Sequence, residues 1–370
     1  MRKKIKLLVD GHWFDYQHES TAVFLRGLYT QLLKDNDFDI FIAAYDVEKL
    51  KKEFDNSSKI TYLKLASSSK YYRLLFDFPQ IIRKNKIDIA HFQYIVPFLK
   101  TTKEIVTIHD ILYKDFPAYF PFGYKLRNDI FFKRSANRAD LITSVSNYSI
   151  RAIHKHFRIP VDRILLVPNG ISEDFFTTPD FSDVGETFRL KNYILCVCRI
   201  EPRKNHLFLV QAYCELELWK TDIQLVLVGR QDIRVKELDT YLDSLSDSVR
   251  KKIVRLENVS LVNLKNLYQQ AKVVVYPSLG EGFGIPPLEA AALGAKVLCS
   301  NATAMSDFSF FKESLFDPND LEAFKAKLID SLISVDYGES TRISKEIKTR
   351  YNWETIAGLF ANEVKKAFNP

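Results

Sequence analysis

Residues 272–300, "KVVVYPSLGEGFGIPPLEAAALGAKVLCS", contain a strand, a turn, a helix and a second strand in succession. Both ends are short apolar runs typical of buried strands, and "LEAAAL" between them consists of strong helix formers. Pro286 and Pro287 suit a first helical turn, because proline fixes φ and lacks an N–H. Gly294 is the expected end of the helix. The stretch therefore predicts a unit of a parallel α/β sheet.

Similar strand candidates alternate with helical patterns along the whole chain, which predicts an α/β fold with two doubly wound domains and a cleft between them. In the first half the candidate strands span 5–11, 39–45, 60–65, 87–93, 104–110, 141–146 and 164–170. A second series spans 193–199, 223–229, 252–259, 272–278 and 296–300. The acidic, turn-rich stretch 172–188 between them is typical of a linker. We expect an N-terminal domain at 1–175, a linker at 176–190, a C-terminal domain at 191–350 and a helix at 351–370 that returns to the N-terminal domain.

The composition is that of a globular protein, because 46% of the 370 residues are apolar and 27% are charged. No apolar run approaches the ~18–20 residues of a membrane span, and the N-terminus does not resemble a signal peptide. We therefore expect a cytoplasmic protein. The cysteines are Cys196, Cys198, Cys214 and Cys299, none with metal-ligand spacing to a histidine, so buried reduced thiols are expected.

Positive charge is concentrated in the first half of the chain. Residues 1–170 hold 28 Lys/Arg and 18 Asp/Glu, a net charge of +10, whereas the remainder holds 25 and 28, a net charge of −3. Such a basic half suits an anionic partner such as phospholipid, a pyrophosphate-linked lipid or nucleic acid, although an ordinary solvated surface explains the charge equally well. The chain has no nucleic-acid-binding motif, so no nucleic-acid partner is expected.

Two segments, 70–86 and 124–138, combine aromatic and basic residues in the positive half. They suit peripheral contact with an anionic membrane surface. Helices that cover a sheet and carry basic outer faces would give the same pattern, so both interpretations stay open.

The turn before the predicted helix suits a phosphate group, because a helix N-terminus offers free N–H groups and a positive dipole end. Gly282 and Gly284 allow close backbone approach to a ligand. Glu281 and Glu289 would repel a diphosphate, but ionised glutamates accept hydrogen bonds from sugar hydroxyls. One glutamate for each sugar of a nucleotide-diphosphate sugar is one interpretation. In the other interpretation, Glu281 caps a turn and Glu289 is an ordinary residue of the first helical turn.

Cations are expected at the same edge of the C-terminal sheet. Arg199 ends one predicted strand and Lys204 opens the next helix, so both side chains can reach a diphosphate at the carboxyl ends of the strands. In the first half, His109 and Asp110 follow a strand at the equivalent edge.

Together these residues resemble the retaining glycosyltransferases of family 4, which have the GT-B fold of two Rossmann-like doubly wound domains facing a central cleft. The resemblance covers nearly the whole chain and rests on "VTIHDILY" (106–113), "LITSVSNYS" (141–149), "ILLVPNGI" (164–171), "CRIEPRKNH" (198–206), "LYQQAKVVVYPSLGEGFGIPPLEAAALGAKVLCSN" (267–301) and "YNWETIA" (351–357). It implies a nucleotide-diphosphate sugar donor, transfer with retention, and no metal or other cofactor.

The resemblance also implies roles for individual residues. Glu289 would hold the nucleotide ribose and Glu281 the donor sugar, while Arg199 and Lys204 would stabilise the diphosphate leaving group. His109 would face the donor sugar, with Asp110 beside it. The donor would also be bound by the backbone N–H groups of Gly282, Phe283, Gly284 and Ile285.

The sequence departs from the family near the first strand, where Glu19, Ser20 and Thr21 replace the usual glycine-rich turn. Ser20 and Thr21 are expected to cap the helix that begins at residue 22 and to donate hydrogen bonds to phosphate or acceptor. Two other patterns are interpreted as non-functional. The Asp-x-Asp pattern at 37–39 lies away from the predicted cleft, and His154 and His156 fall on different helix faces.

The expected function is transfer of a sugar to a saccharide or lipid-linked saccharide acceptor in surface polysaccharide synthesis. A nucleotide-sugar epimerase of the same fold and a non-catalytic nucleotide-sugar binder are the alternatives. The sequence does not name the sugar, the base or the acceptor.

Overall fold

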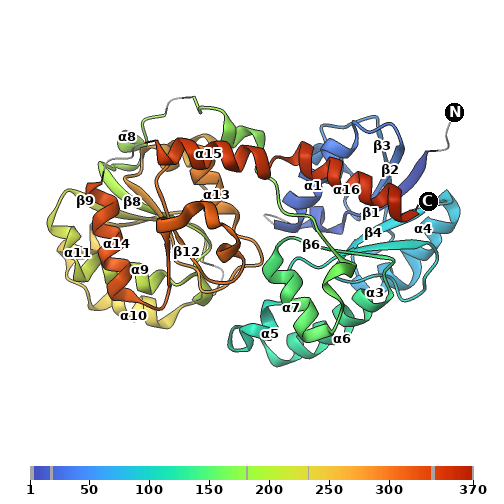
Figure 1. Cartoon of the computed structure of the whole chain (residues 1–370), viewed down its shortest axis with the longest axis horizontal. Coiled ribbons are helices and arrows are strands. Elements are labelled where there is room, and N and C mark those ends of the chain that lie inside the picture. The colour runs from blue at the N-terminus through green and yellow to red at the C-terminus, as the bar shows by residue number, and fades with distance from the viewer. Residues whose placement is uncertain (1–3, 17–19, 181, 232, 335–337, 369–370) are drawn as a thin grey trace. The chain divides into compact units, whose positions relative to one another are not determined.

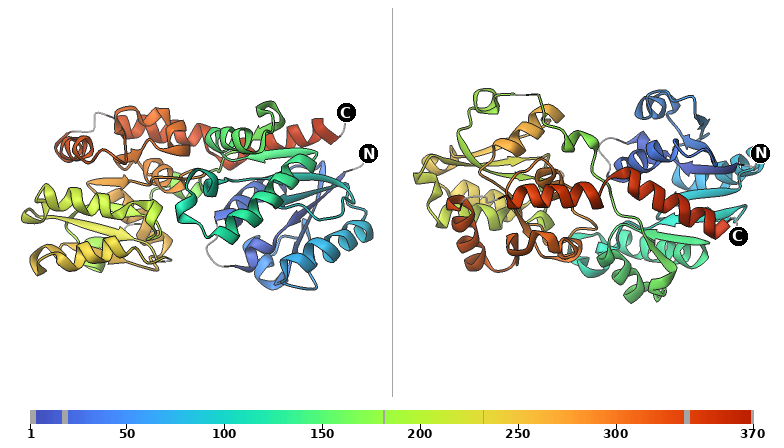
Figure 2. Two further views of the ribbon diagram at one scale, coloured as in Figure 1. Left: turned by 90° about the horizontal axis from the view of Figure 1, so that it is seen from below. Right: turned by 45° about the horizontal axis from the view of Figure 1, so that its top comes forward.

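The computed structural model describes residues 4–16, 20–180, 182–231, 233–334 and 338–368. It divides into two compact units (Figure 1). Unit 1 comprises Met1–Gly170 with Trp353–Pro370, and unit 2 comprises Ile171–Asn352. Figure 2 shows helices on both faces of each sheet.

Unit 1 is built on a parallel seven-stranded sheet of the described residues, in the order β3-β2-β1-β4-β5-β6-β7. The register places Val9 beside Ile42 and His91, in the middle of the sheet. The strands are β1 (Ile5–Asp10), β2 (Phe38–Ala44), β3 (Ile60–Lys64), β4 (Ile89–Gln93), β5 (Lys103–Thr107), β6 (Leu141–Ser144) and β7 (Ile164–Leu166).

Helical segments of unit 1 flank this sheet, and most of them bury apolar residues. They are η1 (His12–Asp15), α1 (Ser20–Leu32), α2 (Val47–Glu53), α3 (Lys70–Tyr72), the π-helix η2 (Arg73–Asp77), α4 (Phe78–Asn85), α5 (Leu112–Asp115), η3 (Pro117–Tyr119), α6 (Phe122–Arg138), α7 (Asn147–Phe157), η4 (Val161–Arg163) and α16 (Trp353–Phe368).

The C-terminal helix α16 packs against α1 within unit 1 (Figure 1). Trp353 fills the space beside two glycines: a Cβ at Gly27 would lie 2.0 Å from the indole ring, and one at Gly170 would lie 2.6 Å from it. Side chains at either position would exclude the indole. The absence of side chains there therefore allows α16 to dock.

Unit 2 repeats the same architecture with a six-stranded parallel sheet in the described residues, in the order β10-β9-β8-β11-β12-β13. The strands are β8 (Asn192–Val197), β9 (Ile223–Val228), β10 (Ile253–Leu256), β11 (Val273–Tyr276), β12 (Val297–Ser300) and β13 (Leu315–Phe316). Each expected strand is present, and β13 is additional, because two residues are too few for a periodic pattern. The α/β doubly wound prediction is confirmed.

The helical segments of unit 2 are η5 (Glu173–Phe176), α8 (Val184–Phe188), η6 (Pro202–Lys204), α9 (His206–Glu215), η7 (Leu218–Lys220), α10 (Lys236–Ser244), α11 (Asp247–Arg250), α12 (Leu261–Gln270), α13 (Ile285–Ala292), η8 (Thr303–Asp307), η9 (Ser309–Ser314), α14 (Leu321–Ile333) and α15 (Glu339–Arg350).

The stretch expected to be a linker without helix contains η5 and α8. Asp183 caps α8 by accepting a hydrogen bond from the Glu186 N–H at 2.9 Å. Ser182 contacts Asn263 of α12 at 2.9 Å, so this stretch packs on unit 2. The expectation of an irregular segment was wrong here, because five helical residues with a side-chain cap give no periodic signal.

Candidate functional site

The candidate site lies at the switch point of the unit 2 sheet, where strand order reverses between the neighbouring strands β8 and β11. Ligands of open α/β sheets bind outside the carboxyl ends of the strands at such a point. The turn that follows β8 carries residues 198–205, and the turn that follows β11 carries residues 277–284. Both turns therefore stand at the expected place for a ligand.

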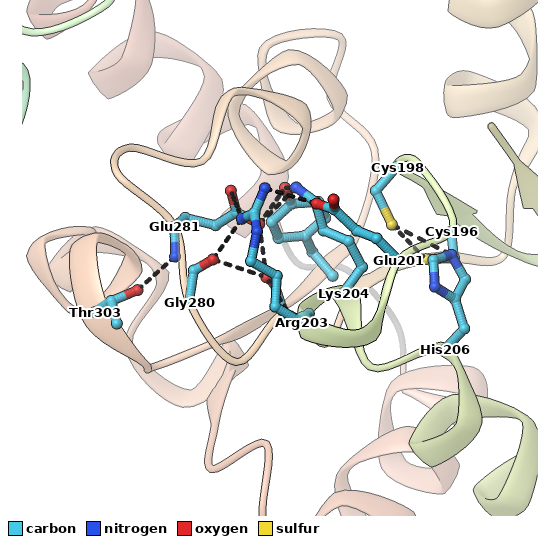
Figure 3. A network of polar contacts seen from close by, with 11 residues as sticks. Cys196, Cys198, Glu201, Arg203, Lys204, His206, Gly280, Glu281 and Thr303 are labelled. Atoms are coloured by element: carbon cyan, nitrogen blue, oxygen red, sulfur yellow. Dashed lines mark hydrogen bonds and ion pairs between the residues drawn. The ribbon is translucent and has the colours of Figure 1, made fainter. Parts of the chain in front are cut away.

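A buried ion network joins these two turns (Figure 3). The Lys204 Nζ atom lies 2.6 Å from Glu281 Oε1, and the Arg203 Nη1 atom lies 3.0 Å from Glu281 Oε2. Arg203 also donates to the carbonyl of Gly280 at 2.6 Å and pairs with Glu201 at 2.6 Å. One carboxylate thus holds two cations from the other turn.

Neutral groups complete the network around Glu281. The Ser278 and Tyr276 hydroxyls lie 2.6 and 3.1 Å from Oε1, and the Glu281 N–H donates to Thr303 Oγ1 at 2.8 Å. Burial alone would raise the pKa of Glu281, but the charges of Lys204 and Arg203 and the hydrogen bonds from Lys204 and Ser278 lower it to about 2. The carboxylate is therefore ionised at neutral pH.

The sequence predicted Lys204 and Glu281 but missed Arg203. In the structure the 3₁₀ turn η6 points Arg203 toward the Gly280 carbonyl, together with Lys204. The sequence feature that could have indicated Arg203 is its position as a second cation directly before Lys204. Arg199 lies exposed just after β8.

The turn before α13 presents backbone N–H groups. Gly284 is the N-cap with φ of +105°, and a Cβ there would lie 3.1 Å from Met305 and 3.3 Å from Phe308. Pro286 and Pro287 have no N–H, so among the first three helical positions only Ile285 can donate to a ligand. The helix dipole still places positive charge at this end.

Phe283 anchors the same turn through its side chain. Its ring is buried and meets Phe308 and Tyr351 edge-on, with centroids 5.7 Å away in both cases. The side chain therefore has a packing role, and only the backbone of this residue is available to a ligand.

At its C-terminal end, α13 closes with a Schellman motif. The Gly294 N–H donates to the carbonyl of Ala291 at 3.0 Å, and the Ala295 N–H donates to that of Ala290 at 3.1 Å. Gly294 has φ of +80°, as the sequence predicted for a helix-ending glycine.

Glu289 is the fifth residue of α13, because the helix begins at Ile285. Its expected position in the first turn was wrong, because the helix begins one residue before Pro286 and Glu289 therefore falls in the second turn. The side chain is partly buried, and the Tyr268 hydroxyl lies 3.4 Å from its Oε2. Burial raises the pKa of Glu289 to about 7, against the weaker opposite effect of Tyr268. This carboxyl group, unlike that of Glu281, changes charge near neutral pH.

In unit 1, His109 belongs to a buried polar network at the carboxyl edge of the sheet. Its Nε2 atom lies 2.8 Å from Gln93 Oε1, and the Gln93 amide nitrogen lies 3.1 Å from His91 Nε2. Burial lowers the pKa of His109 to about 3, so the imidazole is neutral at physiological pH. Asp110 is partly buried and accepts a hydrogen bond from the Leu112 N–H at 3.1 Å.

Ser20 and Thr21 occupy the first two positions of α1, whereas the sequence analysis expected them before the helix. Ser20 is exposed and Thr21 is buried, so only Ser20 presents its side chain to solvent. The capping prediction for Thr21 is wrong, because a residue inside the first turn is past the N-cap position. Glu19 lies outside the described residues.

The two patterns interpreted as non-functional have other partners in the structure. Asp37 pairs with Lys365 of α16 at 2.5 Å, and Asp39 pairs with Lys4 at 3.3 Å. His154 contacts the carbonyl of Ile159, and His156 contacts Asp115. These contacts account for the acidic pair and the histidines as structural residues.

Comparison with known proteins identifies the class. A family model described as "Glycosyl transferases group 1" matches residues 180–350, and one described as "Glycosyltransferase Family 4" matches residues 21–175. Solved structures with the same fold include a glycosyltransferase from Rickettsia africae, with a TM-score of 0.73, 20% identity and 100% coverage of both chains. Anabaena HepE in complex with UDP and glucose has a TM-score of 0.72, 16% identity and coverage of 98% and 100%. The fold is that of the GT-B glycosyltransferases.

Sequence relatives then define the family. The O-antigen chain mannosyltransferase B of Escherichia coli is 30% identical over 270 residues, which cover 71% of this chain and 70% of that protein. The O-antigen chain mannosyltransferase RfbU of Salmonella typhimurium is 27% identical over 66% of this chain and 64% of its own. The match to the E. coli mannosyltransferase WbdA covers 28% of that longer protein. The chain belongs to the glycosyltransferases of family 4.

Among the residues that the structure describes, no helix combines the length and the hydropathy that crossing a membrane requires.

Proposed function

We propose that this glycosyltransferase transfers mannose from a nucleotide-diphosphate mannose to a saccharide acceptor during synthesis of a surface polysaccharide. The relatives named as O-antigen mannosyltransferases support this sugar and this acceptor class. The observation that supports the donor site most strongly is the pairing of Lys204 and Arg203 with Glu281 directly before the N-terminus of α13.

The donor diphosphate binds at the turn that precedes α13. Its oxygens accept hydrogen bonds from the N–H groups of 282–285, and the helix dipole adds positive potential. Lys204 has three donors and directs two of them to Glu281 and Tyr276, so one is available for phosphate. Arg199, exposed at the end of β8, supplies a further cation.

The two glutamates have different tasks. Glu289 accepts hydrogen bonds from the ribose hydroxyls when it is ionised. Glu281 contacts the donor sugar and also fixes the positions of Lys204 and Arg203, because it is paired with both before any ligand binds. This second task explains why a carboxylate is tolerated beside a diphosphate site.

The reaction proceeds with retention and without a metal ion. The bond between the anomeric carbon and the diphosphate oxygen breaks, and the acceptor oxygen forms a bond to the same face of that carbon. The acceptor proton passes to the departing diphosphate. Positive charge from Lys204, Arg199 and the start of α13 stabilises this leaving group, which is the main electrostatic task. We assign His109 of unit 1, which is neutral at physiological pH, as a hydrogen-bonding group for the donor sugar.

A lipid-linked acceptor would place the enzyme at a membrane surface, which two segments of unit 1 suit. Exposed apolar residues occur on α3 with η2 and on α6, among them Phe76 at 57% and Phe122 at 77% exposure. Burial and the charge of Arg127 lower the pKa of Lys70 to about 8, so the two segments interact electrostatically. Co-sedimentation with anionic but not with neutral vesicles is expected. Binding that ignores anionic lipid content would contradict membrane contact through these segments.

One experiment tests the proposed function directly. The purified chain is incubated with GDP-, UDP- and dTDP-sugars, with and without a mannose-terminated acceptor, and each reaction is run with and without a chelator. Transfer of mannose only when acceptor is present, with the anomeric configuration kept, is the expected result. Conversion of the donor without acceptor would indicate an epimerase, and binding without turnover would indicate a nucleotide-sugar-binding protein. Loss of turnover with the chelator would contradict metal independence.

A further inference from the structure

Two cysteines and a histidine form a buried cluster next to the ion network in unit 2 (Figure 3). Cys196 Sγ lies 3.7 Å from Cys198 Sγ, and Cys198 Sγ lies 3.4 Å from His206 Nε2. All three ligand atoms lie within 4.8 Å of one another. The expectation of buried, reduced thiols is confirmed for both cysteines. The histidine beside Cys198 was not expected from the sequence.

The local fold brings these residues together. Cys196 is in β8 and Cys198 follows two positions later, so both side chains point to the same side of the strand. The Cys198 N–H donates to the carbonyl of Val228, which keeps the residue in line with the sheet. His206 begins α9 after the η6 turn, and its ring returns over the end of the strand. The η6 turn therefore brings Cys198 and His206 together although they are eight residues apart in the sequence.

Two of the three separations are close to the edges of a metal coordination polyhedron, and the third, between Cys196 and His206, is within 4.8 Å. A tetrahedral zinc ion with Zn–S near 2.3 Å and Zn–N near 2.0–2.1 Å requires about 3.8 Å between two sulfur atoms and about 3.6 Å between sulfur and nitrogen. The observed 3.7 and 3.4 Å are close to these values. Without metal, the same separations are those of weak hydrogen bonds that keep the three side chains in place.

Charge and ligand softness decide the kind of ion. Two thiolates and a neutral imidazole carry two negative charges, so a divalent ion makes the buried group neutral, which the nearby Lys204 tolerates. Thiolate and imidazole ligands favour zinc over magnesium or calcium, which prefer oxygen. On binding, the two thiols release two protons to solvent.

We propose that Cys196, Cys198 and His206 bind one thiophilic divalent cation of the zinc class, at a position distinct from the donor site. Within the described part of the chain these are the His, Cys, Asp and Glu side chains that gather closely enough to hold a metal. His206 Nδ1 is buried and has no hydrogen-bond partner in the described structure. Metal-ligating histidines usually donate that proton to an outer partner. We therefore expect weaker binding than at four-ligand structural zinc sites.

The test titrates the reduced, full-length chain with Cd²⁺ and follows the thiolate-to-cadmium charge-transfer absorption in the ultraviolet. One equivalent of Cd²⁺ is expected to give the band, and Zn²⁺ is expected to displace it. The double variant Cys196→Ser/Cys198→Ser should lose the band, and His206→Gln should shift the titration to higher Cd²⁺ concentration. Absence of a band in the wild-type chain would overturn the proposal.

Matched controls separate this site from the remaining thiols and from misfolding. Cys214→Ser and Cys299→Ser remove the other two cysteines, and both variants should keep the full band. A band of unchanged amplitude in Cys196→Ser/Cys198→Ser, or its loss in Cys214→Ser, would overturn the assignment. Far-ultraviolet circular dichroism and the thermal midpoint establish that each variant is folded, so loss of the band reports loss of ligands.

Discussion

Lys204 and Glu281 lie 77 positions apart in the sequence, yet the Nζ and Oε1 atoms are 2.6 Å apart and both side chains are buried. Their contact ties the turn after β8 to the turn after β11. The backbone that precedes α13 is therefore held by a charge on the turn that follows the neighbouring strand β8.

Removal of one member of this pair should destabilise unit 2. We expect Glu281→Gln to lower the free energy of unfolding by about 3–5 kcal/mol, because it leaves the buried charge of Lys204 without its carboxylate. Lys204→Met should lower it by less, because Arg203 still pairs with Glu281. The double variant should lose much less than the sum. Urea denaturation of all four proteins measures the coupling, and additive losses would show that the two side chains do not interact.

Gly284 should tolerate no side chain. Alanine at φ of +105° is strained, and its Cβ would also press on Met305 and Phe308. We expect Gly284→Ala to cost about 1–3 kcal/mol and to weaken nucleotide-sugar binding. Gly294→Ala is the matched control, since its φ is also positive but nothing lies within 4 Å of the added atom. Equal losses in both variants would mean that packing at Gly284 is unimportant.

Donor binding should depend on the charge of Glu289. Its raised pKa of about 7 means that the unliganded carboxyl group is half protonated near neutral pH. If the ionised form accepts the ribose hydroxyls, affinity for nucleotide-diphosphate sugar should increase from pH 6 to pH 8. Calorimetric titration across this range measures the slope. Glu289→Gln should bind the donor more weakly, and its affinity should not change with pH. An unchanged pH dependence of affinity in this variant would show that another group titrates.

The carboxyl group of Glu289 should also make the free energy of unfolding depend on pH. Because the folded pKa is raised, the folded chain holds this proton more tightly than the unfolded chain does. The stabilisation is present below about pH 4.5, the ordinary value, and is lost as the pH rises toward 7. Comparison of thermal midpoints for the wild type and Glu289→Gln from pH 5 to pH 8 should show a steeper decline in the wild type.

In unit 1, His91 and His109 should make the free energy of unfolding depend on pH in the direction opposite to Glu289. Burial lowers the pKa of both imidazoles to about 3. The unfolded chain then binds protons that the folded chain does not, so stability falls as the pH decreases below about 6.5. Nuclear magnetic resonance of the imidazole protons should show no titration of either ring above pH 5. A midpoint near 6.5 for His109 would contradict its burial.

Sequence periodicity was sufficient to predict twelve of the described strands. These strands either contain apolar runs of four or more residues or lie next to a recognisable turn sequence. Periodicity failed for β13 and α8, which are too short to show a period. The positions of Lys204 and Glu281 followed from their places at strand ends. Arg203 did not, because a cation directly before Lys204 does not by itself show which way its side chain points in a 3₁₀ turn.

The remaining differences at the site also have local causes. The position of Glu289 within α13 depended on the residue at which the helix begins, and helix propensity does not fix that boundary. The cysteine–histidine cluster depended on how the η6 turn brings His206 back to the end of β8. The spacing of metal ligands in the sequence does not predict the path of that turn.

The most direct test of the central claim compares a nucleoside with its diphosphate. Calorimetric titration of guanosine, GDP, uridine and UDP into the wild type and Lys204→Gln separates binding of the diphosphate from binding of the nucleoside. We expect the variant to lose about 10–100-fold in affinity for the preferred diphosphate, the equivalent of one charge-assisted hydrogen bond, and to keep its affinity for the nucleoside. Equal diphosphate affinity in a folded Lys204→Gln variant would contradict a diphosphate site at the turn before α13.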